Sequence, residues 1–350
     1  MKKNKCKINI NFTMNNSSNY LKKQIKDLNA GDQKIVLTCL VISKADPKFF
    51  EFNGQQRGVW NLILRDTEKD YINCTIWNTD EKIHDLNSII SIGCIVDIEN
   101  PKITIEDEDQ AFQPKCSSRF LLTIDDKRGN ITLNNDFDVN NQLKILLKCP
   151  LKNTNEILRL ADVSLYDKNS VGELVDLLVA IRYNRPAREI LVPKTGLKKK
   201  YKSLIVMDRS NHGMSLNLWS TQSVERAENW PPLQTILFIT DVRVGFSEYF
   251  QTITLTETVK TLFIVNPIGK EAEELAMYVM STPLKDIEVS LSDDMIDVNR
   301  INDVMTVQQI LEKSEGNVTR TEGDQFTALC YGVLTKFDLD GVYPCVRRRW

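Results

Sequence analysis

The stretch Leu62-Ile63-Leu64-Arg65-Asp66 is followed by Trp77, eleven residues after its aspartate. The same arrangement returns in Leu204-Ile205-Val206-Met207-Asp208, where Trp219 stands eleven residues after the aspartate. In both places the pattern predicts an apolar strand, a polar turn opened by Asp, and an alternating strand that ends in tryptophan. A pattern that returns at so long a distance indicates one small structural unit that the chain builds more than once.

A short polar segment compatible with a helix follows each tryptophan, over 79–88 and 221–229, and another apolar strand follows that segment. A five-stranded barrel with a helix between its third and fourth strands is an OB-fold. The sequence therefore predicts a mainly β protein of tandem OB-fold barrels, two of them complete and a third only begun at the C-terminus. The predicted parts are a disordered basic arm over 1–20, an acidic first OB-fold over 21–130, a linker over 131–170, a basic second OB-fold over 171–266, a helical connector over 267–325 and the start of a truncated third OB-fold over 326–350.

Composition excludes several classes of protein. The 350 residues carry a formal net charge of −2 and contain only two histidines, so a histidine-based catalytic or metal centre is not expected. We predict no cofactor and no metal. No apolar run approaches the roughly 20 residues that a membrane span needs, so no membrane partner is expected. The eight cysteines lack the spacing of a disulfide framework, which favours reduced thiols in an intracellular protein.

The two predicted barrels differ in charge. Residues 28–116 contain 9 Lys or Arg against 15 Asp or Glu, a balance of −6, whereas residues 171–266 contain 12 against 9, a balance of +3. Affinity for a polyanion depends on the local density of cations. The second unit is therefore the better candidate for a nucleic-acid partner.

Single-stranded nucleic acid is held in OB-folds by aromatic rings that stack on bases and by cations that contact phosphates. The second unit has both kinds of residue. We expect three lysines in its loop between strands one and two, Trp219 at the end of strand three, and Phe250 at the start of strand five. The predicted nucleic-acid-binding residues are Lys198, Lys199, Lys200, Lys202, Arg209, Trp219, Arg243, Phe246, Tyr249 and Phe250.

Each of these assignments has a plainer alternative. Trp219 could pack in the core, the lysines could form a solvated loop, and Phe246 and Tyr249 could cover the mouth of the barrel. In the first unit, the acidic run Glu106-Asp107-Glu108-Asp109 is expected to repel phosphate. That run is either a solvated loop or a protein-docking surface, and Trp77 is then a structural residue.

Three further motifs are Ile98-Glu99-Asn100-Pro101, Trp230-Pro231-Pro232 and Thr240-Asp241-Val242-Arg243-Val244. Together with the order of the OB units, they resemble the family of meiosis-specific proteins with OB domains, which are paralogues of the replication protein A large subunit. The resemblance covers about residues 25–345. It implies that the second unit binds single-stranded DNA, with Lys198–Lys200, Trp219 and Phe250 at family contact positions.

The same resemblance implies a role in meiotic double-strand-break repair and crossover formation, on chromosomes in the nucleus. It also implies replication protein A and a meiosis-specific cofactor as partners, and a single-strand 3′→5′ exonuclease activity. The sequence departs from the family near its end, where Cys345 stands alone instead of a Cys-x-x-Cys zinc ribbon. Four ligands are needed for structural zinc. We therefore expect a truncated third unit that does not bind the partner.

Two other functions stay open at this point. An exonuclease would need convergent carboxylates for its metal ions, and no Asp-x-Glu set lies on the predicted cleft of the second unit. A structural adaptor would use all of the units to dock proteins. The sequence does not decide between DNA and RNA, because base stacking is indifferent to the 2′-hydroxyl.

Overall fold

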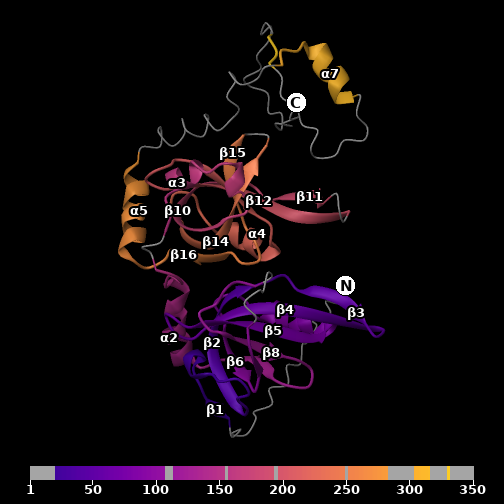
Figure 1. The fold of residues 1–350 in the computed structure, drawn as a ribbon, viewed down its shortest axis with the longest axis vertical. Helices are drawn as coiled ribbons and strands as arrows, with labels where there is room; N and C mark the ends of the chain where they lie inside the picture. The colour runs from indigo at the N-terminus through magenta and orange to yellow at the C-terminus, as the bar shows by residue number, and fades with distance from the viewer. Residues whose placement is uncertain are drawn as a thin grey trace, which may run out of the picture. The chain divides into compact units, whose positions relative to one another are not determined.

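The computed structural model describes residues 20–106, 113–153, 157–192, 196–248, 251–282, 303–315 and 329–331. Contacts divide the chain into two compact units. The first contains Met1–Asn153 and Val259–Ile268, and the second contains Thr154–Thr258 and Gly269–Trp350. Each unit is built around a curled β-sheet (Figure 1).

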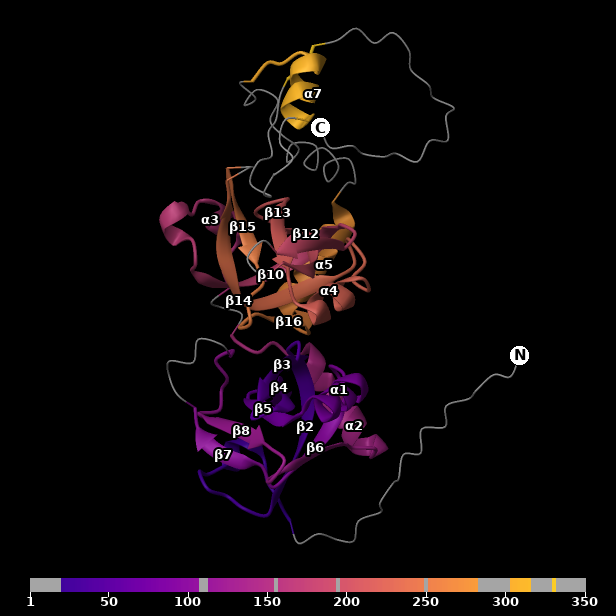
Figure 2. The ribbon, with the colours of Figure 1, turned by 90° about the vertical axis from the view of Figure 1, so that its right-hand side faces the viewer.

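The first unit is a curled sheet whose main strands run in the order β7-β8-β5-β4-β2-β6-β9. Figure 2 shows α1 on one side of this barrel and the hairpin of β7 and β8 on the other. The elements of the unit are β1 (Leu21–Lys22), η1 (Ile25–Asp27), β2 (Ile35–Lys44), β3 (Lys48–Phe52), β4 (Gln55–Arg65), β5 (Tyr71–Thr79), α1 (Asp80–Ile89), β6 (Ile95–Glu99), β7 (Lys102–Ile105), β8 (Phe120–Ile124), β9 (Asn130–Leu133), α2 (Phe137–Lys144), η2 (Ile145–Lys148) and β16 (Leu262–Val265).

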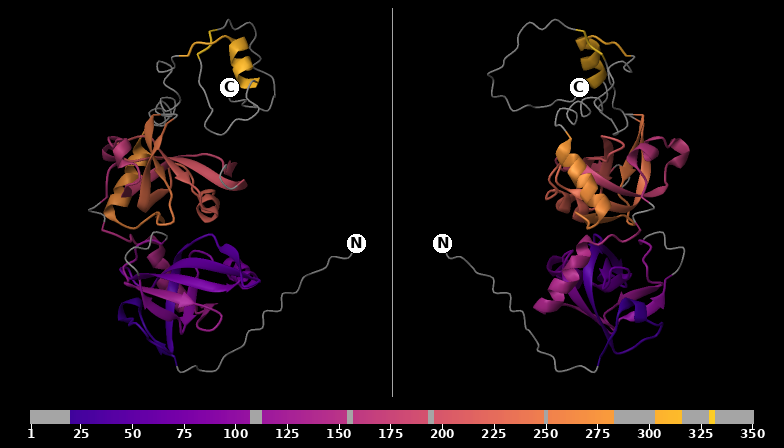
Figure 3. Two further views of the ribbon diagram at one scale, coloured as in Figure 1. Left: turned by 45° about the vertical axis from the view of Figure 1, so that its right-hand side comes forward. Right: turned by 90° about the vertical axis from the view of Figure 1, so that its left-hand side faces the viewer.

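The second unit closes its barrel, because β10 pairs with β12 at one edge and with β14 at the other. Between them the order is β12-β13-β15-β14. Figure 3 shows α5, drawn in orange, against the outside of this barrel. The elements are α3 (Leu160–Ser164), η4 (Lys168–Ser170), β10 (Leu174–Asn184), β11 (Arg188–Val192), β12 (Leu197–Met207), β13 (Met214–Leu218), α4 (Thr221–Ala227), β14 (Ile236–Ser247), β15 (Thr252–Thr256), α5 (Lys270–Ser281) and α7 (Val307–Glu315).

The register of the central strands repeats between the two units. Leu62 is paired with Cys74 in the first unit, and Leu204 is paired with Leu216 in the second. Both residues of the second pair lie 142 positions after their counterparts in the first. All four side chains are buried. Because side chains alternate across a strand, an equal register places corresponding residues on the same face of each barrel. Positions of the two units can therefore be compared one by one.

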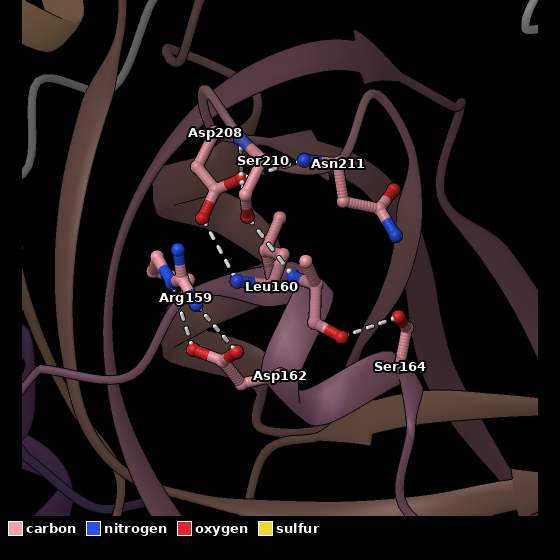
Figure 4. A network of polar contacts seen from close by, with 8 residues as sticks. Arg159, Leu160, Asp162, Ser164, Asp208, Ser210 and Asn211 are labelled. Carbon is pink, nitrogen blue, oxygen red and sulfur yellow. Dashed lines mark hydrogen bonds and ion pairs between the residues drawn. The ribbon is translucent and has the colours of Figure 1, made fainter.

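The repeated aspartates perform the same task in the two units. A carboxylate oxygen of Asp66 accepts a hydrogen bond from the backbone N–H of Ile25 at 2.7 Å. In the second unit, Asp208 accepts from the N–H of Leu160 at 2.8 Å and also from the backbone of its own turn (Figure 4). Each aspartate thus fixes the segment that leads into its barrel, and Asp208 also shapes its own turn. This second role could not be read from the turn sequence.

The prediction of mainly β, tandem OB-folds is confirmed for the two complete units. Helices follow both tryptophans as predicted, with Thr79 and Ser220 as their N-caps, and α5 lies within the range predicted for a helical connector. The third predicted unit lies outside the described residues except for 329–331, and so do residues 1–19 of the predicted arm. No helix in the described parts of the chain has both the length and the apolar character to cross a membrane.

One local prediction is wrong. The lysines predicted in a loop lie in β12, which pairs with β11 as a hairpin. In the first unit, β3 and β4 form a second hairpin. Both hairpins project from their barrels as two-stranded arms (Figure 1).

Candidate nucleic-acid interface

A groove of about 610 Å³ opens on the second unit. Its floor consists of alternate residues of the central strands, and β14 forms one wall. The lining residues are Val171, Gly172, Arg185, Tyr201, Ser203, Ser215, Asn217, Arg243, Val244, Gly245, Phe246, Ser247, Thr254 and Thr256.

Strand alternation explains why this face is polar and open. Ser203 is paired with Asn217, and both line the groove. Their neighbours Leu204 and Leu218 point to the opposite side, where both are fully buried. Short hydroxyl and amide side chains leave space above the sheet and offer hydrogen-bonding groups. This combination suits a flat polar ligand such as a nucleobase.

Two aromatic residues stand together at one end of the groove. The rings of Trp219 and Tyr201 have centroids 4.6 Å apart with an angle of 50° between their planes. The Tyr201 hydroxyl donates to Asn217 at 2.6 Å. Trp219 is half-buried, so it is not sealed in the core, and both aromatic rings lie where a base could be placed.

Phe246 lies on the β14 wall of the groove, as expected for a residue near the barrel mouth. The ammonium of Lys168 lies 4.6 Å from the centre of its ring. The same ammonium contacts the carboxylate of Glu248 at 3.0 Å, in an ion pair exposed to solvent. An exposed pair contributes little to stability, because water screens it. Lys168 is therefore a cation at the groove that sequence reasoning missed. Tyr249 and Phe250, which were also predicted here, lie outside the described residues.

The lysine cluster lies on the projecting hairpin. All three of Lys198, Lys199 and Lys200 are exposed. Lys199 shares the face of β12 that carries Tyr201, and its ammonium lies 6.0 Å from the centre of the Trp219 ring. Lys198 and Lys200 lie on the other face, near Glu189 at 3.9 Å and Glu225 at 3.3 Å. Of the three, Lys199 is the one directed toward the aromatic pair.

Two predicted cations lie away from the groove. Lys202 is 1% exposed, and its ammonium pairs with Glu228 at 2.9 Å on the core side of β12. The corresponding position in the first unit is the core residue Trp60. Arg209 donates to the backbone carbonyl of Glu274 on α5 at 2.9 Å. The structure therefore brings neither residue to the groove.

Arginines complete the positive character of the groove. Arg243 was predicted, is exposed and lines the β14 wall. Arg185 also lines the groove, and Arg188 is paired across the hairpin with Tyr201, so its side chain projects on the side of that ring. Among the described residues, the side chains of these three arginines have no hydrogen bond or ion pair. Sequence reasoning missed Arg185 and Arg188 because the strand that carries Arg188 was not predicted.

The corresponding face of the first unit is occupied by its own chain. Thr75 is the counterpart of Asn217, and its hydroxyl accepts from the Gln113 amide at 3.1 Å. Asn73 is the counterpart of Ser215, and its amide donates to the carbonyl of Pro114 at 2.9 Å and to Glu106 at 2.6 Å. Burial raises the pKa of the Glu106 carboxyl. Positions that line a groove in the second unit thus have counterparts in the first unit that are hydrogen-bonded to the segment around Pro114.

Trp77, for which we expected a structural role, is not sealed in the core, because 40% of its surface is exposed. The edge of Phe50 approaches it with 6.1 Å between ring centroids. Phe49 stacks on His84 at 4.2 Å, at the base of the same hairpin. The first unit therefore also carries partly exposed aromatic rings. Of the predicted acidic run, only Glu106 lies within the described residues.

Comparison with known proteins shows the family to which the chain belongs. The family model described as "MEIOB, N-terminal" matches residues 4–152. Protein hold'em of Drosophila melanogaster is 31% identical over 333 residues, which are 89% of this chain and 68% of that protein. The chain belongs to the family of meiosis-specific proteins with OB domains. Another member, the meiosis-specific with OB domain-containing protein of Rattus norvegicus, is 24% identical over 90% of this chain and 68% of its own length.

A solved structure shares the architecture of this family member. It is a replication protein A heterotrimer bound to single-stranded DNA, and the TM-score is 0.54 at 15% sequence identity. The match covers 75% of this chain and 55% of the other. At this level of identity, the similarity concerns the fold.

Proposed function

We propose that this protein binds single-stranded DNA through the groove of its second OB-fold. The observation that supports the proposal best is the groove itself, where Tyr201, which packs against Trp219, lines the same space as Arg185 and Arg243. Neither arginine side chain has a hydrogen bond or ion pair with another described residue. Unpaired bases expose both faces to such rings, and each stacked base contributes about 1–3 kcal/mol. Duplex DNA hides these faces, so the site selects single strands.

The polar floor suits the same ligand. Ser203, Ser215 and Asn217 offer donors and acceptors to base edges. Arginine side chains at the rim contact phosphates and release counterions, so affinity falls as the salt concentration rises. The first unit contributes less to binding, because Gln113 and Pro114 occupy its corresponding face.

Membership of the family supports a cellular role for this binding. We infer that the protein acts in meiotic homologous recombination, in double-strand-break repair and crossover formation on chromosomes in the nucleus. Replication protein A and a meiosis-specific cofactor are the inferred partners, by resemblance to the family of the relatives that are named for meiosis. The described residues contain no group of three His, Cys, Asp or Glu side chains that could hold a metal ion.

Fluorescence anisotropy with a labelled oligonucleotide tests the proposal. Trp219→Ala is expected to weaken binding about tenfold, the effect of one lost base stack. Trp77→Ala is the matched control, because it removes the corresponding indole from the first unit. Equal affinity of the wild type and the Trp219 variant, or an equal loss in both variants, would contradict the proposed site. Competition with duplex DNA and with RNA of the same sequence then defines the ligand.

A further inference from the structure

Glu257 follows β15 and receives four hydrogen bonds from the segment that contains Trp219. One carboxylate oxygen accepts from the backbone N–H of Trp219 at 2.8 Å and of Ser220 at 3.1 Å. The other accepts from the hydroxyls of Ser220 at 2.8 Å and Ser223 at 2.5 Å. Hydrogen bonds to an ionised acceptor are about twice as strong as neutral ones. This carboxylate therefore fixes the path of the chain between β13 and α4.

The first unit shows what the chain does without such a carboxylate. There β5 continues to Thr79, and Trp77 is still paired with Val59 in the strand ladder. In the second unit β13 ends at Leu218, so Trp219 has left the ladder opposite Tyr201. The pairing of the closing strand, Cys74 with Leu122 and Leu216 with Leu255, makes Ile124 the counterpart of Glu257. Ile124 is buried, and its hydrocarbon side chain cannot accept a hydrogen bond.

We propose that Glu257 is a positioning residue, which turns Trp219 out of the strand ladder and holds its ring against Tyr201 at the end of the groove. The backbone N–H of Trp219 donates to the carboxylate of Glu257. Its indole is consequently free to tilt against Tyr201 at 50°. This inference rests on the proposed function of the groove, but it concerns a residue that is not among those that line the groove.

The substitution Glu257→Gln gives a test in which two explanations predict opposite signs. Removing a negative charge near the groove should tighten the binding of a polyanion if electrostatics alone matters. The positioning role predicts the reverse, because the amide end of glutamine presents N–H groups to donors. We expect binding of a labelled oligonucleotide to be about fivefold to tenfold weaker. Glu271→Gln on α5 is the matched control, since it removes an exposed carboxylate of the same unit and should not weaken binding.

Two further measurements separate positioning from a general loss of structure. Glu257→Asp keeps the charge but shortens the side chain, and it should also weaken binding; thermal melting shows whether each variant is folded at the assay temperature. In the Trp219→Ala background, Glu257→Gln should cost no additional affinity, because the ring that it positions is gone. With an abasic oligonucleotide, the effect of Glu257→Gln should also disappear.

The outcomes distinguish this inference from the proposed function. If the wild type does not bind, or if Trp219→Ala binds as the wild type does, the proposed function of the groove fails. If Trp219→Ala is weakened but Glu257→Gln binds as well as the wild type or more tightly, the positioning role alone is overturned. Additive losses in the double variant would also overturn it, because Glu257 would then act independently of Trp219.

Discussion

The phenol of Tyr201 supports the indole of Trp219 and is itself held by Asn217. The ring centroids lie 4.6 Å apart, and the Tyr201 hydroxyl donates to the Asn217 side chain at 2.6 Å. Arg188 is the residue paired with Tyr201 across the projecting hairpin. Tyr201 thus connects the arm, the groove floor and the half-buried tryptophan, although its sequence position beside four lysines gave no indication of this role.

Substitution of Tyr201 should separate the contribution of its ring from that of its hydroxyl. Tyr201→Ala removes a surface for base stacking and the support of Trp219, so we expect affinity for single-stranded DNA to fall about tenfold or more. Tyr201→Phe keeps the ring and loses only the bond to Asn217, and it should stay within about threefold of the wild type. Anisotropy titrations of both variants measure this difference. An equal loss in both would assign the effect to the hydroxyl.

The salt dependence of binding should distinguish Arg243 from Lys202. Arg243 is exposed at the groove, so Arg243→Met should lower the slope of log affinity against log salt by about 0.7, the value for one phosphate contact to a single strand. Lys202 is buried against Glu228, and Lys202→Met should leave the slope unchanged. Titrations at four salt concentrations determine both slopes. A lower slope for the lysine variant would show that its ammonium reaches the ligand.

The sequence was sufficient to predict the repeated barrel because its signals are local. Each copy contains a short stretch of alternating residues, around Leu62 or Leu204, that is followed by an aspartate at the start of a turn, Asp66 or Asp208. These signals predict the same strand and turn in both copies. Identical register follows from them, because a slip by one residue would turn the apolar side chains toward water. The helix after each tryptophan could be predicted for the same reason, from its capping residue and composition.

The lysine-rich arm could not be predicted, because its lysines carry no pattern of alternating burial. Lys198, Lys199 and Lys200 are all exposed, so no apolar alternation marks β12 before Tyr201. Pairing with β11 makes this stretch a strand, and pairing is a property of the tertiary structure. Alternation then separates residues that look equivalent in sequence, since Lys199 lies on the Trp219 side and Lys202 faces the core. Glu257 was missed because its partners are 34 to 38 positions away in sequence.

The stability of the first unit should depend on pH through Asp66. Burial raises the pKa of this carboxyl from its ordinary 3.8 to about 6, and one of its oxygens has no hydrogen-bond partner among the described residues. A raised pKa means that the folded state favours the protonated form. The stabilisation is therefore fully present below about pH 4 and is lost as the pH rises through about 6.

Asp66→Asn should remove this dependence. Relative to the variant, the wild type should lose melting temperature between about pH 4.5 and pH 7.5, because only the wild type must bury a charge at the higher pH. Asp85→Asn, at an exposed position of α1, serves as the control and should show no such difference. Parallel melting curves for the wild type and Asp66→Asn at all pH values would contradict the assignment.

Arg65 should contribute more to the stability of the first unit than any surface ion pair. Its guanidinium is fully buried and donates to the carbonyls of Leu146 at 3.0 Å, Cys149 at 2.7 Å and Pro150 at 3.2 Å. It thereby attaches the segment around η2 to the barrel. The corresponding position in the second unit is Met207, which packs with the apolar residues of α5 instead.

Replacing Arg65 with methionine, the residue at the corresponding position of the second unit, should therefore destabilise the first unit. Arg65→Met leaves several buried carbonyls without a donor, and each costs about 1–3 kcal/mol, so we expect a loss of about 3 kcal/mol or more in the free energy of unfolding. Met207→Leu conserves an apolar contact and should cost less than about 1.5 kcal/mol. Urea denaturation of the two variants gives the comparison. Arg65 belongs to the first unit, whereas the groove lies in the second. Without urea and at low temperature, Arg65→Met should therefore retain the DNA affinity of the wild type. A loss of affinity under these conditions would show that the first unit supports binding.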